Sequence, residues 1–207
     1  MTPFVVEPPV AILAAGDFPT HPVAVKALED AATVVCLDSA ADAYTARYGL
    51  PQLVVGDGDS ISPALRRELG ARFVHMAEQD TNDLCKAIRY LAAQGVKEAV
   101  VLGGTGRRED HTLGNIFHLP GLSRLVRLTM VTDFGTFRPA NGHVELDVAV
   151  GQQVSVFNLT CTRLASDGLR WPVSAFGELW QGTLNEAVAP RLALDGDGDY
   201  LVYTAHV

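Results

Sequence analysis

Short apolar runs alternate with helical stretches over the first two thirds of the chain, and this alternation restricts the possible folds more than any other feature. The runs are brief and often β-branched, as expected of parallel strands buried on both faces. Parallel strands need crossover connections, usually helices, so the pattern predicts an α/β domain with a mainly parallel sheet. The six runs are Val10–Ala14, Thr33–Leu37, Leu53–Val55, Phe73–Met76, Ala99–Leu102 and Leu128–Val131.

Two of the intervening stretches are clear helix candidates, Val23–Asp30 and Asn82–Gln94. In the second, apolar residues recur at i, i+3, i+4 and i+7, which places them on one helix face. These residues are Leu84, Ala87, Ile88 and Leu91.

The pattern changes after Asp133, where short strand-like runs are separated by turn signals. Val154–Asn158 and Tyr200–Tyr203 have the character of strands, and no convincing helix is visible. Such a segment is typical of a small all-β sandwich. We therefore expect an α/β domain over residues 1–134 and a β-sandwich domain over residues 135–207.

Composition narrows the function classes. The 207 residues are 48% hydrophobic and carry a formal net charge of −8, a globular composition without the basic face that a nucleic-acid binder needs. A nucleotide site stays possible, because Mg²⁺ can supply positive charge locally. Three cysteines without a CxxC pair argue against a disulfide scaffold or zinc site, and neither a leader nor an apolar run of about 18 residues is visible. We expect a cytoplasmic protein without membrane or nucleic-acid partners.

The segment Gly56-Asp57-Gly58-Asp59-Ser60 follows the third predicted strand directly. Ligands of open α/β sheets bind beyond the carboxyl ends of the strands, and paired carboxylates there suit Mg²⁺ bridged to phosphates. A plain Gly/Asp turn explains the segment equally well when it is considered alone.

A second acidic pair, Asp80 and Asp83, precedes and opens the helix predicted over Asn82–Gln94. Asp80 or Thr81 could cap this helix, with Asp83 favoured near its positive end. Capping and metal binding are compatible, because both carboxylates could face the same opening.

A third polar cluster, Gly103–His111, follows the fifth predicted strand. Its glycines allow backbone N–H groups to approach phosphate, and its arginines offer planar donors to phosphate oxygens. It is not a Walker A motif, and a solvated surface loop is the alternative. For His111 a structural role is favoured over a catalytic base, and for Asp195–Asp199 a hairpin turn is favoured over a calcium loop.

Three motifs in this order resemble the thiamine pyrophosphokinase family, whose patterns are G-D-x-D-S, D-x-T-D and G-G-R-x-D-H. Further matches are Asp38, Asn115 and the segment Gly168–Pro172, so the resemblance runs from about Ala14 to Glu186. The chain departs from the family patterns at several positions. Arg107 stands where a glycine is usual, Leu184 stands where a serine is usual, Asn82 replaces threonine and Asp38-Ser39-Ala40 replaces D-G-G.

The resemblance implies an α/β catalytic domain followed by a β-sandwich, in homodimers with active sites at the subunit interface. It implies Mg²⁺ and ATP phosphates held by Asp57, Asp59 and Asp83, and a catalytic polar wall completed by Asp80 and Gln79. The remaining implied roles are ATP or phosphate binding by Asp38, Gln79, Arg108, Asp110 and Asn115, with Asp110 also positioning substrate, and thiamine binding by Trp171 and Asn185.

The implied reaction transfers pyrophosphate from ATP to the thiamine hydroxyl, giving thiamine diphosphate and AMP. Two alternatives remain open from the sequence. A metal-dependent nucleotide phosphohydrolase would use the same carboxylates with water as the nucleophile. A non-enzymatic thiamine or thiamine-diphosphate sensor should have lost the metal carboxylates, and this chain retains them.

Overall fold

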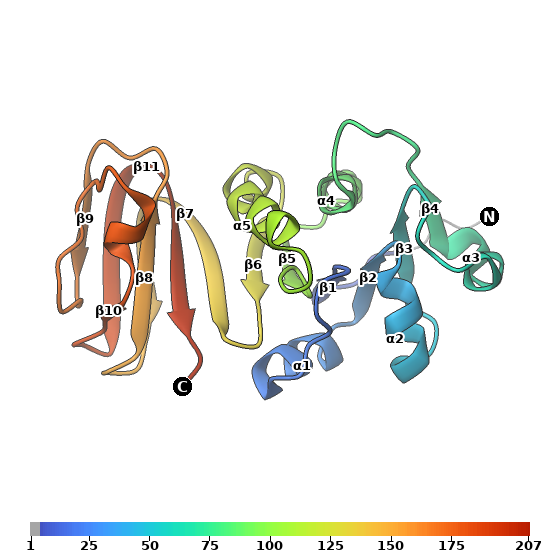
Figure 1. Cartoon of the computed structure of the whole chain (residues 1–207), viewed down its shortest axis with the longest axis horizontal. Helices are drawn as coiled ribbons and strands as arrows, with labels where there is room; N and C mark the ends of the chain where they lie inside the picture. Colours follow the sequence, from blue (N-terminus) through green and yellow to red (C-terminus); the bar gives the residue numbers. More distant parts are fainter. Residues whose placement is uncertain (1–4) are drawn as a thin grey trace. The chain divides into compact units, whose positions relative to one another are not determined.

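The computed structural model describes residues 5–207, and the chain divides into a first unit that ends at Asp133 and a second unit, Phe134–Val207. The domain boundary expected between residues 134 and 135 lies one residue from this division. The first unit is an α/β domain with a parallel sheet and the second is built from antiparallel strands, so the predicted fold class is confirmed (Figure 1). Over residues 5–207, no helix combines the length and the apolar character needed to cross a membrane.

The first unit contains every strand expected there. Its strands are β1 (Val10–Leu13), β2 (Thr33–Leu37), β3 (Leu53–Gly56), β4 (Phe73–His75), β5 (Glu98–Leu102) and β6 (Arg127–Val131). They lie in the order β6-β5-β1-β2-β3-β4, and every neighbouring pair is parallel.

Helices cover both faces of this sheet, α1 and α2 on one side and α4 and α5 on the other (Figure 1). The helices are α1 (Pro22–Glu29), α2 (Ala40–Tyr48), α3 (Pro63–Leu69), α4 (Asp83–Ala93) and α5 (Glu109–Ser123), with a 3₁₀ turn η1 (Gly70–Arg72) after α3. The two helix candidates of the sequence are α1 and α4. The other three were not identified from the sequence.

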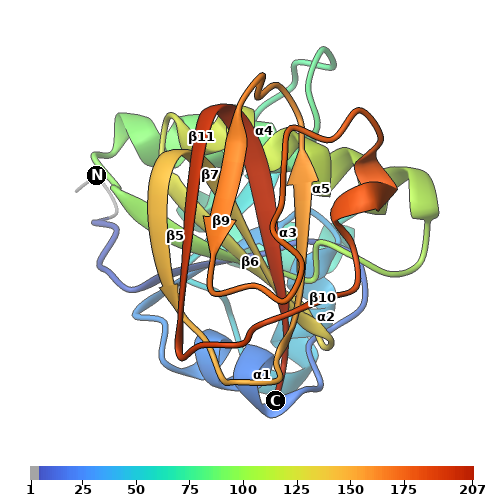
Figure 2. The same cartoon turned by 90° about the vertical axis from the view of Figure 1, so that its left-hand side faces the viewer.

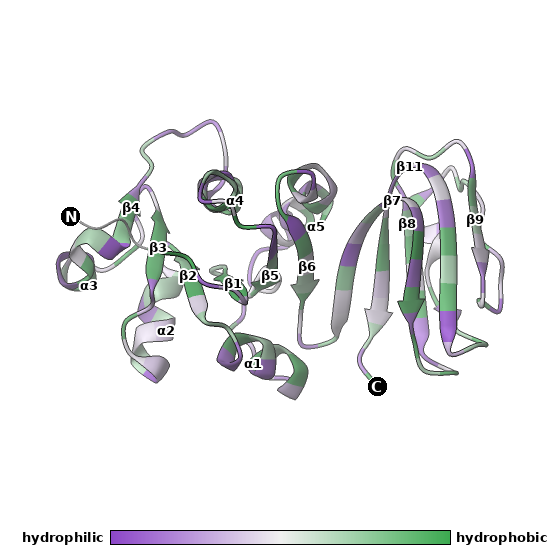
Figure 3. Cartoon of the chain, turned by 180° about the vertical axis from the view of Figure 1, so that it is seen from behind, coloured by the Kyte–Doolittle hydropathy of each residue, from purple (hydrophilic) through white to green (hydrophobic). Residues whose placement is uncertain are grey.

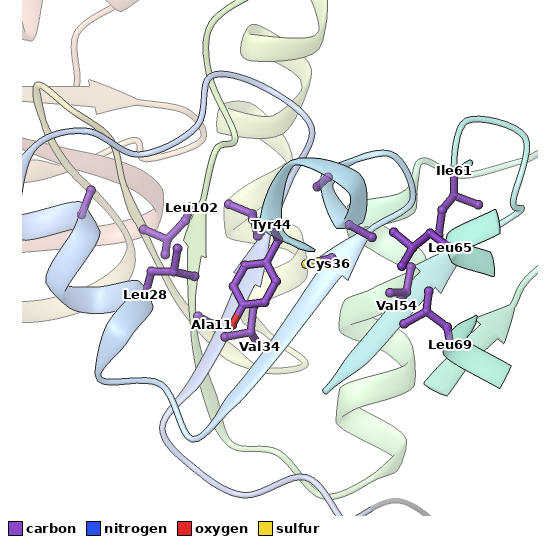
Figure 4. Packing of buried hydrophobic residues seen from close by; sticks show 14 of the residues in the cluster. Ala11, Leu28, Val34, Cys36, Tyr44, Val54, Ile61, Leu65, Leu69 and Leu102 are labelled. Carbon is purple, nitrogen blue, oxygen red and sulfur yellow. The ribbon is translucent and has the colours of Figure 1, made fainter. Parts of the chain in front are cut away.

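The packing under α1, α2 and α3 shows why the strands are apolar on the face that these helices cover. Tyr44 of α2 and Leu65 of α3 pack on buried side chains of β1, β2 and β3, including Cys36 and Val54 (Figure 4). Figure 3 shows the same distribution, with hydrophobic colour concentrated on the strands and polar colour on outward helix faces. Burial raises the pKa of the Cys36 thiol, which is therefore an inert core residue.

The strand order creates a switch point between β1 and β5. The chain leaves β1 toward β2 on one side, whereas β5 joins β1 from the other side after the α4 crossover. In open α/β sheets a crevice forms outside the carboxyl ends of the strands at such a point, and ligands bind there.

The second unit is built around two long antiparallel strands, with shorter strands along one of them (Figure 2). Its elements are β7 (Gly135–Asp147), β8 (Gln153–Asn158), β9 (Leu164–Asp167), β10 (Asn185–Glu186) and β11 (Arg191–Ala205), with a 3₁₀ turn η2 (Leu179–Gly182). β11 pairs with β7 along its length, while its other edge pairs with β9 through Ala193–Gly196 and with β8 through Tyr200–Thr204.

Both halves of β11 contribute to one core. Leu192 and Leu194 from the first half, and Tyr200 and Val202 from the second, are buried in the same cluster. The bent sheet therefore encloses its core as a sandwich does.

The prediction of a hairpin turn at Asp195–Asp199 is wrong. These residues lie inside β11, and the pairing register with β7 shifts between Gly196 and Asp199, which marks a bulge. Asp197 accepts hydrogen bonds from the Thr162 and Arg163 N–H groups at 2.8 and 2.9 Å. The glycines and aspartates thus bend a strand and do not reverse the chain.

Candidate active site

A cleft of about 640 Å³ opens at the carboxyl ends of the parallel strands of the first unit. The segments that line it follow β1, β2, β3 and β5, and they include the first turns of α4 and α5. Two helix N-termini therefore open into the cleft, and the positive ends of the two helix dipoles favour anions there.

Two loops meet backbone to backbone at the switch point. The Gly16 N–H donates to the Gly103 carbonyl at 2.8 Å, and the Asp17 N–H donates to the Thr105 carbonyl at 2.8 Å. A Cβ on Gly16 would stand 2.1 Å from the Thr105 oxygen, so only glycine allows this approach. The contact fixes the glycine-rich loop after β5 at the edge of the cleft.

The carboxylates of Asp57 and Asp83 both contact the ammonium group of Lys86. The Lys86 ammonium lies 3.0 Å from Asp83 Oδ1 and 3.5 Å from Asp57 Oδ2, and the lysine side chain is only 2% exposed. Asp57 also accepts from the Asp59 N–H and from Gln79 Nε2, both at 3.1 Å. These two hydrogen bonds, together with the Lys86 charge, lower the pKa of the Asp57 carboxyl.

Asp38 follows β2 and is a buried carboxylate, 4% exposed. Its Oδ2 accepts from the Ser60 N–H at 2.9 Å, while its buried Oδ1 has no hydrogen-bond partner. Burial, with the nearby charges of Asp83 and Asp57, raises the pKa of Asp38. An acidic oxygen of this kind, without a partner of its own, is suited to a ligand or cation in the cleft.

The loop before α4 is fixed differently from expectation. Neither Asp80 nor Thr81 caps the helix; the N-cap is Asn82, whose Oδ1 accepts from the Cys85 N–H at 2.9 Å. The Glu78 carboxylate accepts from the Asp80 and Thr81 N–H groups at 2.9 and 3.1 Å, and so holds the turn. This arrangement leaves Asp83 in the first helical turn, facing the cleft.

The loop before α5 brings the predicted phosphate ligands to the cleft. Arg108 and Asp110 form an ion pair at 2.5 Å, and both side chains are more than half exposed. Asn115 lies one turn further along α5 and donates to the Gly104 carbonyl at 2.9 Å. It also accepts a 3.5 Å contact from Asn82, so it links the glycine-rich loop to the start of α4.

Not every predicted site residue lies in the cleft. Asp59 and Asp80 are exposed and are not part of its lining, so their catalytic and metal-binding roles stay predictions. The predicted residues that the structure does bring together there are Asp38, Asp57, Gln79, Asp83, Arg108, Asp110 and Asn115.

Lys86 is the main residue that the sequence analysis missed. It stands three residues after Asp83, a spacing that places both side chains on neighbouring positions of a helix. That spacing is the only sequence signal for it. His111, expected to be structural, is exposed and lines the cleft.

The donor set fits a hard cation. Mg²⁺ in proteins commonly takes one or two carboxylates, with phosphate and water oxygens completing its shell. Asp57 and Asp83 already share the Lys86 ammonium as a partner. Asp38 Oδ1, which has no hydrogen-bond partner, adds a further oxygen to the same cleft. Within residues 5–207 no group of three or more acidic, histidine or cysteine side chains is arranged to hold a metal ion.

In the second unit, Trp171 is not a core residue. Its side chain is 57% exposed, while the buried Asn185 side chain accepts from the Trp171 N–H at 3.1 Å and donates to its carbonyl at 2.6 Å. Asn185 therefore fixes the backbone that presents the indole. Leu184 and Trp180 nearby in the chain are also exposed, at 77% and 70%.

Two departures from the family pattern occupy unusual backbone. Arg107 and Leu184 have φ of +59° and +61°, and within the described residues Asp38, at +38°, is the only other residue besides glycine with positive φ. Side chains with a Cβ rarely adopt this region. Strained backbone therefore occurs in the motif segments of both units.

Family models match both units. The model described as "Thiamin pyrophosphokinase, catalytic domain" matches residues 24–131. The chain belongs to the thiamin pyrophosphokinase family. The model described as "Thiamin pyrophosphokinase, substrate-binding domain" matches residues 135–203, which lie within the second unit. The predicted family is thus confirmed, and the cleft lies in the unit that carries the catalytic-domain match.

Curated thiamin pyrophosphokinases match part of the chain. Thiamine pyrophosphokinase 1 of Oryza sativa subsp. japonica is 36% identical over 93 residues, which is 40% of this chain and 35% of the relative. Thiamin pyrophosphokinase 1 of Caenorhabditis elegans is 33% identical over 75 residues, 33% of this chain and 30% of the relative. The matched segments therefore span about a third of these relatives.

Solved thiamin pyrophosphokinase structures share the fold over nearly the whole chain. The Bacillus subtilis enzyme has a TM-score of 0.79 at 20% identity, covering 95% of this chain and 98% of that one. The Candida albicans enzyme has a TM-score of 0.76 at 15% identity, covering 95% and 89%. At such identities the likeness establishes the fold, and the chemistry must be argued from the site.

Proposed function

We propose that this protein is a thiamine pyrophosphokinase, a transferase that moves a pyrophosphoryl group from ATP to the hydroxyl of thiamine and releases AMP. The observation that carries the proposal is that the carboxylates of Asp57 and Asp83 both contact the Lys86 ammonium at the carboxyl edge of the sheet. Such an acidic pair beside a glycine-rich loop and arginines is suited to a metal-bound polyphosphate.

The chain's own residues would bind and orient the nucleotide. Backbone N–H groups of the glycine-rich loop and the Arg108 guanidinium would hold phosphate oxygens. Gln79 would orient the Asp57 carboxylate, and Asn115 would hold the glycine-rich loop at Gly104. Asp57 and Asp83, with Asp59 beside them, would hold Mg²⁺, which when bound would neutralise the polyphosphate charge. Asp38 would add a further oxygen at the floor of the cleft, and Asp80 a polar group outside it.

Thiamine would be recognised by the second unit. The exposed indole of Trp171 can stack on a pyrimidine ring and attract the positive thiazolium ring. Asn185 would act by fixing the backbone that presents this indole, and Asp110 would help position the substrate. ATP and thiamine are thus the proposed substrates, and neither nucleic acid nor a membrane is a proposed partner.

The proposed assembly is a homodimer in which each active site draws on both subunits, the carboxylates from one chain and Trp171 from the other. The proposed compartment is the cytoplasm, since all three cysteines are free and buried.

A charge-neutral substitution tests the proposal. Asp57→Asn should lower thiamine-dependent ATP consumption by roughly 10²-fold or more, because it removes charge where the polyphosphate must be neutralised. Asp30→Asn, which changes an exposed carboxylate just after α1, is the control and should retain activity. ATP consumption that does not depend on thiamine would favour the phosphohydrolase, and full activity in folded Asp57→Asn would reject the site.

A further inference from the structure

Lys86 is an unusual residue for its position. The chain has only three lysines among 16 basic residues, and the other two, Lys26 and Lys97, are not buried. Lys86 is 2% exposed and lies at the start of α4, where its sequence neighbours Cys85 and Ala87 are buried as well. Lysine is almost never fully buried unless its charge is paired, so the site must compensate it.

The compensation comes from the two carboxylates assigned to the metal. The Lys86 ammonium lies 3.0 Å from Asp83 Oδ1 and 3.5 Å from Asp57 Oδ2, and these two ion pairs offset the cost of burying its charge. The ammonium therefore lies in the cleft as a paired charge.

Without Lys86, the cleft would hold several carboxylates and no compensating charge at its floor. The buried Asp38 carboxylate lines the same cleft as Asp57 and Asp83. Like charges in one cleft repel more strongly when they are partly removed from water. A cation at the position of Lys86 Nζ relieves this repulsion.

We propose that Lys86 is a positioning residue that acts as a built-in counter-cation. It holds Asp57 and Asp83 together before metal and nucleotide arrive, and it restricts tight metal binding to the nucleotide-bound state. The inference rests on the proposed function, because it takes these two carboxylates as metal ligands. It follows that Lys86 opposes the binding of Mg²⁺ alone, because the ammonium and the metal ion would use the same oxygens of Asp57 and Asp83. When ATP is bound, its phosphates add negative charge, and Mg²⁺ can then bind beside the ammonium.

Lysine suits this role better than arginine. Its ammonium is a compact point charge with three donors on a flexible stem, and it can stay between two oxygens that come from different elements. A guanidinium is larger and planar, and prefers bidentate pairing with one carboxylate. Of the two carboxylates, Asp57 follows β3 and Asp83 opens α4, so the ammonium joins two elements.

The test measures Mg²⁺ binding to the full-length protein without nucleotide or thiamine, by calorimetry, with melting temperatures recorded in chelator and in millimolar Mg²⁺. Lys86→Met keeps the length of the stem and removes the charge. It should bind Mg²⁺ about tenfold more tightly than wild type, because one positive charge beside the ion is gone. It should also melt about 5 °C lower in chelator, with most of that loss recovered in Mg²⁺.

Three further variants make the result specific. Lys26→Met removes a lysine that is ion-paired with Asp30 on the surface, and should change neither measurement. Lys86→Gln should change Mg²⁺ affinity in the same direction as Lys86→Met, and it serves if the methionine variant folds poorly. In an Asp83→Asn background, Lys86→Met should lose most of its effect on Mg²⁺ affinity.

Unchanged Mg²⁺ affinity in both Lys86 variants, or a loss of melting temperature that is equal with and without Mg²⁺, would overturn the inference and leave Lys86 as a packing residue. These measurements involve no turnover. A failure of the proposed reaction, judged by product analysis, is therefore distinguishable from a failure of this inference.

Discussion

At the scale of single residues, Asp38 combines three costs. It is buried, one of its oxygens has no hydrogen-bond partner, and its backbone φ is +38°. Such residues are found at functional sites, where a bound ligand can interact with the polar atom that has no partner in the folded protein. Asp38 therefore has a cost in stability that its substitution can reveal.

Asp38→Asn should raise the melting temperature of the metal-free protein by about 3 °C at pH 7.5 while lowering turnover. Asparagine keeps the shape, can still accept from the Ser60 N–H and tolerates positive φ. Because the folded pKa of Asp38 is raised, its charge opposes folding at neutral pH, and this penalty disappears below the ordinary pKa of about 3.9.

Thermal denaturation in chelator at pH 7.5 and near pH 4 measures this difference, with Asp30→Asn as the control. The gain should be present at pH 7.5 and nearly absent near pH 4. A lower melting temperature of Asp38→Asn at pH 7.5 would contradict the account.

Burial is the property of a residue that the sequence predicts least. The acidic motifs indicated Asp57 and Asp83 as cleft residues, but not that a buried lysine joins them. A lysine three residues into a helix pattern is usually exposed, and only the packing of α4 shows otherwise. Trp171 differs from expectation in the other direction. An aromatic residue in a small sandwich usually lies in the core, but the Trp171 side chain is mostly exposed.

At the scale of elements, the strands of the first unit were predictable because each is a short apolar run, often with β-branched residues. The missed helices lack such a pattern. α2 buries only Ala40, Ala41 and Tyr44, and α5 contains Pro120 and two glycines, which are usually helix breakers. Tertiary packing, not local propensity, decides these two elements.

The contact between the β1–α1 and β5–α5 loops gives a prediction at this scale. Gly16→Ala should lower stability by about 2 kcal/mol and also lower turnover, because the new Cβ would meet the Thr105 and Gly103 carbonyls and force the loops apart. Gly121→Ala in α5 is a matched control with open space around it, and should raise stability by about 0.5 kcal/mol. Urea denaturation measures both, and equal effects of the two variants would show that the loop contact is unimportant.

At the scale of the whole molecule, the chain comprises two units with different candidate roles, each matched by its own family model. The change from alternating α and β segments to strands alone was visible in the sequence. The order of strands, and the bend of β11 at its bulge, were not, because both depend on contacts between distant residues.

The proposed sharing of active sites between subunits predicts complementation. Trp171→Ala should raise the thiamine KM about tenfold or more, with little change in the ATP KM, and Asp57→Asn should be nearly inactive. After subunit exchange, a mixture of the two should recover up to about a quarter of wild-type activity, since half of the dimers would own one intact site. No recovery, with exchange confirmed by mass spectrometry of tagged subunits, would place each complete site within one chain.

The most direct test of the central claim is the identity of the products. Purified protein incubated with ATP, Mg²⁺ and thiamine should form thiamine diphosphate and AMP in equal amounts, as followed by chromatography and phosphorus NMR. Formation of ADP with thiamine monophosphate, or release of phosphate without thiamine, would contradict pyrophosphoryl transfer at this site.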